Sequence, residues 1–226
     1  MNHGMEIVWL SIGAIIMGLS LLFFALQYRR MSKRHAEEEK DEIRNQNQNN
    51  IMFVVFVVFL AFISYLLMLF ASLYSTEENV TLIRYVEWFI TTPLLLLDLA
   101  LIARFEFKTI YLMIFLDLLM IILGLAAVYS SNLYLKYALF LLSTGAMIAL
   151  FYILFNPKHK SPHLDEKTLK KSNDANLYTT VLWSLYPLVW IMSNQGLGIF
   201  STSHATLAYM ILDVLAKAAF GFLLIM

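Results

Sequence analysis

Residues 84–103 of this chain read RYVEWFITTPLLLLDLALIA. The stretch is long enough to cross a hydrocarbon core as a helix of about 20 residues, yet it contains Arg84, Glu87 and Asp98. Ionisable side chains inside a membrane are costly and indicate a functional site. At helical spacing Arg84, Glu87, Thr91 and Asp98 share one face. The stretch therefore predicts a membrane helix with a polar stripe.

The rest of the chain has the composition of a membrane protein. Of its 226 residues, 60% are hydrophobic and 14% are charged, and there is no cysteine to form a disulfide or a thiolate metal site. Apolar stretches of spanning length occur at about 6–28, 51–75, 80–103, 108–129, 133–155, 176–195 and 201–226. They predict an all-α membrane protein of seven transmembrane helices, with residues 1–226 as a single domain. The first stretch lacks the features of a signal peptide, so we expect it to be retained.

Basic residues are unevenly distributed among the connections. Thirteen of the sixteen lie in the first, third and fifth connections: Arg29, Arg30, Lys33, Arg34, Lys40, Arg44, Arg104, Lys108, Lys158, Lys160, Lys167, Lys170 and Lys171. The positive-inside rule places these connections in the cytoplasm. We therefore expect a multi-pass protein of the cell membrane with an extracellular N-terminus and a cytoplasmic C-terminus. The polar segment 29–50 is interpreted as a solvated loop that extends two helices, or as a docking site for a partner or anionic lipid.

Six ionisable residues are predicted inside the spans: Arg84, Glu87, Asp98, Asp117, Asp213 and Lys217. Asp213 and Lys217 are four residues apart and share a helix face. They could form an ion pair that fixes helix packing, but a buried lysine is also a Schiff-base former, which is the interpretation we favour. Asp98 and Asp117 have no basic neighbour within a few residues, so we expect burial to keep them protonated in the dark.

Aromatic residues recur on two spans. Trp183, Tyr186 and Trp190 follow each other at helical spacing, and Tyr85 and Trp88 lie on the third span. Such a stripe alone is more typical of a helix core than of a cofactor site. Near a buried lysine it could line the pocket of a long, flat polyene. Prolines at 93 and 187 predict either static kinks or hinges.

These motifs resemble the microbial (type 1) rhodopsins, and in particular the bacteriorhodopsin-like light-driven proton pumps. Residues 84–103 resemble the third-helix signature of that family, and LDVLAKAAFG (212–221) resembles its retinal-lysine signature. The segments WSLYPLVW (183–190), SYLLML (64–69) and WLSIGAIIMGL (9–19) resemble its sixth, second and first helices. The resemblance implies a single bundle of seven helices around all-trans retinal, covalently bound to Lys217.

The resemblance also implies roles for individual residues. Glu87 takes the place of the counter-ion and proton acceptor, Asp98 that of the proton donor, and Asp213 that of the second counter-ion. Arg84 resembles the extracellular gate, and Thr91 the threonine bonded to the acceptor. Positions that resemble the retinal pocket are Tyr65, Trp88, Leu95, Asp117, Met120, Gly124, Ser143, Thr144, Trp183, Tyr186 and Trp190. Leu95 implies green absorption, and no metal site is implied.

Two departures from the family pattern stand out. Glu87 occupies a position where proton pumps usually have aspartate, and a glutamate there also occurs in light-gated channels of algae. Gln195 and Ala205 replace the extracellular glutamate pair that releases a proton early in bacteriorhodopsin. Fast proton release is therefore expected to be absent or rerouted.

The resemblance implies a light-driven outward proton pump, which is an ion transporter and not an enzyme. The alternatives are a sensory photoreceptor, a light-gated channel and an inward proton transporter. The chloride-pump and sodium-pump patterns do not fit a chain that has carboxylates at 87 and 98. The expected partners are the lipid bilayer, protons and further copies of this chain as a homo-oligomer. A transducer protein is expected only if the protein is sensory, and no nucleic acid is expected.

Overall fold

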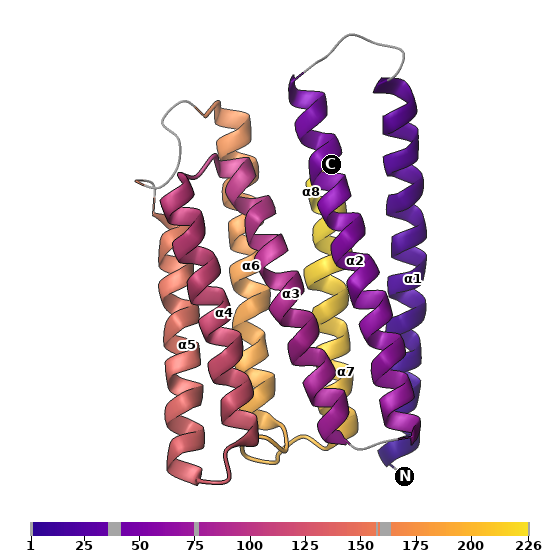
Figure 1. The fold of residues 1–226 in the computed structure, drawn as a ribbon, viewed down its shortest axis with the longest axis vertical. Helices are drawn as coiled ribbons and strands as arrows, with labels where there is room; N and C mark the ends of the chain where they lie inside the picture. The colour runs from indigo at the N-terminus through magenta and orange to yellow at the C-terminus, as the bar shows by residue number, and fades with distance from the viewer. Residues whose placement is uncertain (1, 36–41, 75–76, 157, 159–163, 226) are drawn as a thin grey trace. The chain divides into compact units, whose positions relative to one another are not determined.

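The computed structural model describes all residues except 1, 36–41, 75–76, 157, 159–163 and 226. Its long elements are all helices (Figure 1): α1 (Asn2–His35), α2 (Glu42–Tyr74), α3 (Glu77–Ala103), α4 (Phe107–Tyr129), α5 (Leu133–Phe155), α6 (Glu166–Met192) and α7 (Thr202–Asp213). The last continues through a π-helical segment, η2 (Val214–Ala219), into α8 (Phe220–Ile225). Within the described residues the prediction of seven helices and no strand is confirmed. The predicted cytoplasmic positions Lys40, Lys160 and Met226 lie outside those residues.

Six of the helices contain segments that are long and apolar enough to span a membrane. They are His3–Ser32, Ile51–Tyr74, Asn79–Ala103, Phe107–Tyr129, Leu133–Phe155 and Thr202–Leu223. The helix α6 is long enough, at 27 residues, but it is less apolar, because polar residues such as Asn176 and Thr179 occupy its buried face.

The bounds of α6 differ from the prediction of 176–195. The helix begins at Glu166, ten residues earlier, because the polar segment before Asn176 is also helical. It ends at Met192, since the next residues form a turn in which the Gly196 amide donates to the Ser193 carbonyl at 3.0 Å. Gly198 then adopts a positive φ of 69°, a conformation that glycine tolerates at little cost.

The surface of the helices is apolar, and the ionisable residues of the spans lie inside. Exposed apolar side chains occur on several helices: Ile15, Leu22, Phe70, Phe115, Leu141 and Ile148. The side chains of all six ionisable residues that the sequence analysis identified are buried. This distribution is the reverse of that in a soluble protein and is the one that a bilayer requires.

The chain divides into two compact units. The first comprises residues 1–83 and 188–226, and the second comprises residues 84–187, so the division falls inside α3 and inside α6. In the first unit α1 packs against α2 and α7. The prediction of a single domain over residues 1–226 stays a prediction.

The second unit contains four helical segments that are linked in a closed cycle. Thr92 of α3 bonds to Asp117 of α4, and Ser143 of α5 bonds to the Met120 carbonyl of α4. Asn176 of α6 bonds to the Leu154 carbonyl of α5. The rings of Trp88 on α3 and Tyr186 on α6 are in contact.

Candidate functional site

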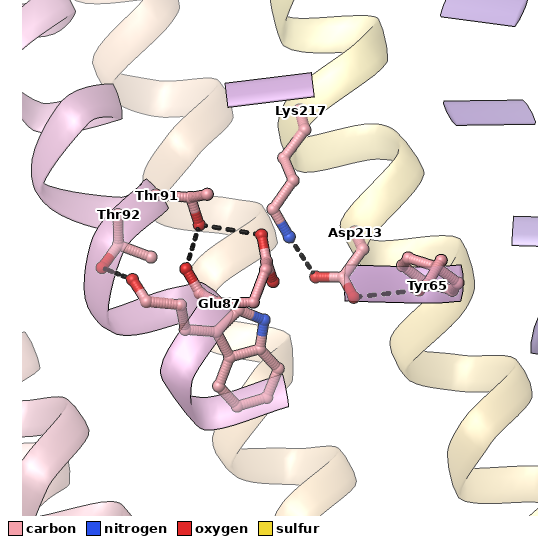
Figure 2. Close-up of polar contacts among 7 residues, drawn as sticks. Tyr65, Glu87, Thr91, Thr92, Asp213 and Lys217 are labelled. Atoms are coloured by element: carbon pink, nitrogen blue, oxygen red, sulfur yellow. Dashed lines mark hydrogen bonds and ion pairs between the residues drawn. The ribbon is translucent and has the colours of Figure 1, made fainter. Parts of the chain in front are cut away.

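Lys217 lies in the first unit with its amine buried next to a carboxylate. Its Nζ donates to Asp213 Oδ1 at 2.6 Å, and the two side chains are 2% and 0% exposed. Tyr65 of α2 donates its phenolic hydrogen to Asp213 Oδ2 at 2.9 Å (Figure 2). The carboxylate is therefore held between an amine and a phenol, which fixes the position of both its oxygens.

The backbone around Lys217 is π-helical. In η2 the turn is wider than in an α-helix, and the Phe220 amide donates to the Leu215 carbonyl five residues back. Single π-helical turns inside α-helices frequently occur at functional sites. The sequence VLAKAA contains neither glycine nor proline, so it gives no signal for this widening, and the sequence analysis missed it.

Gly13 of α1 allows the Tyr65 ring to pack directly against the helix backbone. A Cβ atom at residue 13 would collide with the Tyr65 ring and would lie 3.0 Å from Met210 Cγ. The ring cannot move without weakening its hydrogen bond to Asp213. Gly13 is thus part of the support of the Lys217 site.

Gly13→Ala is therefore expected to destabilise the protein by about 1–3 kcal/mol, the usual range for overpacking a buried site. The measurement is thermal unfolding in detergent. Gly145→Ala is the matched control, because a Cβ built at Gly145 of α5 would have no atom of another helix within 4 Å, and alanine favours a helix over glycine by about 0.5–1 kcal/mol. Equal melting temperatures for the Gly13→Ala variant and the parent would contradict the proposed support of Tyr65.

In the second unit Glu87 and Thr91 form a buried pair on α3. The Thr91 hydroxyl lies 2.9 Å from Glu87 Oε1 and 2.9 Å from the Glu87 carbonyl oxygen (Figure 2). The two side chains are 2% and 0% exposed. Thr91 thereby holds one oxygen of the Glu87 carboxyl in a fixed position.

The next residue, Thr92, connects α3 with α4. Its hydroxyl donates to Asp117 Oδ2 at 2.8 Å and lies 2.8 Å from the Trp88 carbonyl. Asp117 is 0% exposed, and its Oδ1 has no hydrogen-bond partner. Thr92 was not among the predicted site residues, because its partner lies 25 residues away in sequence.

Asp98 lies further along α3 and is 1% exposed, with no hydrogen-bond partner at its Oδ1 atom. No basic residue lies within a few positions of Asp98 in the sequence, but the fold brings Lys171 of α6 close enough to interact with Asp98 electrostatically. Burial lowers the pKa of the half-buried Lys171 amine, and the charge of Lys167 lowers it further. The Asp98 carboxyl raises the pKa of Lys171 when it carries a negative charge.

The aromatic residues of the second unit form a connected group. The Trp88 ring lies 5.1 Å from Tyr85 and meets Tyr186 edge to face at 5.2 Å. Gly124 of α4 is buried against the group, since a Cβ atom there would lie 3.2 Å from Tyr85 Cε1 and 3.5 Å from Ser143 Oγ. A larger residue at 124 would have to displace the tyrosine.

The remaining predicted residues are divided between the units. In the second unit Arg84, Leu95 and Trp183 are buried, Met120 is half-buried, and the half-buried Thr144 donates to the Phe140 carbonyl at 2.9 Å. Trp190 is buried in the first unit. The structure thus brings together Lys217, Asp213 and Tyr65 in one unit, and the pairs Glu87 with Thr91, Thr92 with Asp117 and Trp88 with Tyr186 in the other.

A seventh buried ionisable residue was missed. Glu6 of α1 is 2% exposed, and its Oε2 lies 3.7 Å from Nδ1 of the exposed His3. The sequence analysis did not count it because it is the first residue of a predicted span. Burial so close to a helix end depends on packing that the sequence does not reveal.

Comparisons with known proteins point to one family, and the matches cover nearly the whole chain. A family model described as bacteriorhodopsin-like protein matches residues 4–226. Archaerhodopsin-2 from Halobacterium sp. is 38% identical over 66% of this chain and 58% of that protein. Bacteriorhodopsin from Halobacterium salinarum is 32% identical over 97% of this chain and 82% of that protein. The crystal structure of cyanorhodopsin from the cyanobacterium Calothrix sp. matches with a TM-score of 0.86 at 28% identity, covering 98% of this chain and 94% of that one.

Proposed function

Because the chain belongs to the bacteriorhodopsin-like family of microbial rhodopsins, we propose that it is a light-driven pump that exports protons from the cell. One observation carries this proposal: two buried carboxyl groups, Glu87 and Asp98, lie on the same helix. Eleven residues separate them, or about 16 Å along an α-helix. A proton acceptor and a proton donor at different depths are what directional transfer requires.

The residues fit retinal as the resident cofactor. A prosthetic aldehyde needs a buried amine that can become a Schiff base, which Lys217 provides. A polyene needs flat apolar walls, and this is the role that we propose for Trp88 and Tyr186, whose rings are in contact. When bound, retinal supplies light absorption and a linkage nitrogen whose proton affinity changes on illumination. We assign all-trans retinal to Lys217, with the predicted pocket residues as its surroundings.

Asp213 is assigned as the second counter-ion. A positive charge at the Lys217 nitrogen is strongly disfavoured in a buried site unless an anion compensates it. The carboxylate at 2.6 Å provides this anion, and the Tyr65 hydroxyl orients it. With Arg84 and Glu87 also charged, the four residues sum to zero net charge.

Glu87 is assigned as the primary counter-ion and proton acceptor, and Thr91 as the residue that orients it. A general base must present a fixed lone pair to the proton that it accepts, and the Thr91 hydroxyl fixes the Glu87 carboxyl at Oε1. Arg84 lies three residues before Glu87, nearly one turn away, and is assigned as the extracellular gate.

Asp98 is assigned as the proton donor on the cytoplasmic side. The assignment of sides follows the basic residues of the first, third and fifth connections, which place the N-terminus outside and the C-terminus inside. A buried carboxyl that is protonated in the dark can return a proton to the Lys217 nitrogen after the first proton has moved to Glu87. We further expect the protein to form a homo-oligomer in the lipid bilayer.

The test is illumination of unbuffered cells that express the protein and are supplied with all-trans retinal. Outward pumping predicts that the external pH falls in light, recovers in the dark, and no longer falls when a protonophore is added. Cells that express the Lys217→Ala variant are the control. An unchanged pH would favour the sensory alternative, a rise would indicate inward transport, and a change that reverses with the imposed membrane potential would indicate a channel.

A further inference from the structure

The proposed proton path leaves one buried carboxyl group without a role, that of Glu6 on α1. Its side chain is 2% exposed and lies inside the apolar segment His3–Ser32, where an ionisable residue is costly and indicates a function. The first turn of α1 contains no acidic residue, so Glu6 lies too far along the helix to compensate the partial positive charge of its N-terminus. The burial of Glu6 needs another explanation.

Two contacts in the first unit fix how α1 lies against the helix formed by α7, η2 and α8. A Cβ atom at Gly13 would lie 3.0 Å from Met210 Cγ, and a Cβ atom at Gly221 would lie 2.7 Å from Phe24 Cζ. The two residues of each pair are 197 positions apart in the sequence. The two helices therefore run parallel and stay in step along their length (Figure 1).

Two turns before Gly13 and Met210, the same two helix faces carry Glu6 and Ser203. Glu6 is therefore level with Ser203, which is also buried. From Ser203, residues at spacings of three and four continue this face for about 21 Å to the Lys217 amine. They are all buried, and all but the methionine are polar: Ser203, Thr206, Met210, Asp213 and Lys217. Glu6 thus lies level with the outer end of a mostly polar, buried helix face that starts at Lys217.

The Glu6 carboxyl has a neighbour that reaches solvent. Glu6 Oε2 lies 3.7 Å from Nδ1 of His3, whose side chain is 63% exposed, and a small rotation of the ring would bring the two atoms within hydrogen-bond distance. A buried carboxylate requires a compensating positive charge, which His3 supplies when it is protonated. Imidazole exchanges its proton with water near neutral pH. The other described titratable side chains at this end of α2 and α7, Tyr74 and His204, are exposed.

We propose that Glu6 is the proton-release residue of this chain and that it passes its proton to the extracellular water through His3. The O–H bond of the Glu6 carboxyl breaks, the proton moves to Nδ1 of the neutral imidazole, and the imidazolium loses a proton to water. Glu6 takes up a proton from the interior before the next cycle. The inference rests on the proposed function and adds the exit of its path. It also explains how release is rerouted, since neither Gln195 nor Ala205 can release a proton.

The first measurement is proton release by the purified, retinal-reconstituted protein after a flash, followed with a pH-sensitive dye. Glu6→Gln keeps the shape of the side chain but has no proton to release, so release should slow by about 10²-fold, as for the loss of a positioned acid. His3→Ala should also slow release, and added imidazole should restore it in this variant but not in Glu6→Gln. His204→Ala is the matched control, because this exposed histidine contacts Ser201 and its loss should leave release unchanged.

A second measurement is the infrared difference between illuminated and dark protein. The parent should lose a protonated-carboxyl band on illumination, and this band should be absent from Glu6→Gln. The visible absorption band shows whether a variant is folded, and His3→Ala with imidazole carries the test if Glu6→Gln is colourless.

Unchanged release in coloured Glu6→Gln, or in His3→Ala without imidazole, overturns the inference. Equal infrared differences in the parent and in Glu6→Gln overturn it as well, even if cells acidify their medium in light. If the Glu6 band is lost on illumination but cells do not acidify their medium, the proposed export fails and the release of a proton by Glu6 stands.

Discussion

Lys217→Ala is expected to abolish the visible absorption band completely, even when all-trans retinal is added in excess. A Schiff base requires a primary amine, and Lys217 is the only fully buried lysine in the part of the chain that the structure describes. Lys136 and Lys171 are half-buried, and Lys108, Lys158, Lys167 and Lys170 are exposed. The measurement is an absorption spectrum of the purified protein after incubation with retinal.

The substitution should also destabilise the fold, and this effect must be separated from the loss of colour. Removing the amine takes away the positive charge next to the buried Asp213 carboxylate, although the hydrogen bond from the Tyr65 hydroxyl stays (Figure 2). Breaking a buried ion pair in this way typically costs about 3–5 kcal/mol. Lys217→Arg is the matched variant, because it keeps a positive charge near Asp213 but offers no primary amine. It should fold better than Lys217→Ala and be equally colourless, and a visible band in either variant would refute the assignment of Lys217.

The helices were predictable because each apolar stretch has the length of a membrane span, and the predicted and observed bounds of α4 and α5 differ by one residue or none. The sixth helix was predicted least well. Hydropathy identifies the helix only from residue 176, because charged residues such as Glu166, Lys170 and Asp174 make the segment before it resemble a polar loop. The π-helical turn at Lys217 could not be predicted, since it depends on packing around η2 and not on residue type.

The candidate site was predictable where its residues are close in sequence. Helical spacing alone places Thr91 next to Glu87 and Asp213 next to Lys217, and both hydrogen bonds are present. Contacts between helices required the fold or the family resemblance. The electrostatic interaction of Asp98 with Lys171 and the bond from Thr92 to Asp117 join residues that no local pattern connects.

The polar face of α6 is an intermediate case. The spacing of 172, 176, 179, 183 and 186 is visible in the sequence and could have marked one continuous buried face. What the sequence does not give is the partner of Asn176, whose Nδ2 donates to the Leu154 carbonyl of α5 at 2.9 Å.

Glu87→Gln is expected to stop proton transport and to shift the visible absorption band to the red. An amide cannot take up a proton from the Lys217 nitrogen, and loss of a positioned general base typically lowers a rate by about 10²–10⁴-fold. The red shift follows because a nearby anion stabilises the positive charge at the Lys217 nitrogen more in the dark state than in the excited state. The measurements are the absorption maximum of the purified protein and the light-induced acidification of cells.

Two variants show whether the carboxylate itself is responsible. Glu87→Asp keeps the negative charge but shortens the side chain by one methylene, so it should retain colour and part of the transport. Thr91→Val removes the hydroxyl that lies 2.9 Å from Glu87 Oε1 and keeps the anion, so its effect should be smaller than that of Glu87→Gln. Acidifying the parent protein should protonate Glu87 and reproduce the red shift of the glutamine variant, whereas Glu87→Gln itself should lack this acid transition. An acid transition of equal size in both proteins would assign the counter-ion to another carboxyl group, with Asp213 as the first to examine, because it already holds the Lys217 amine.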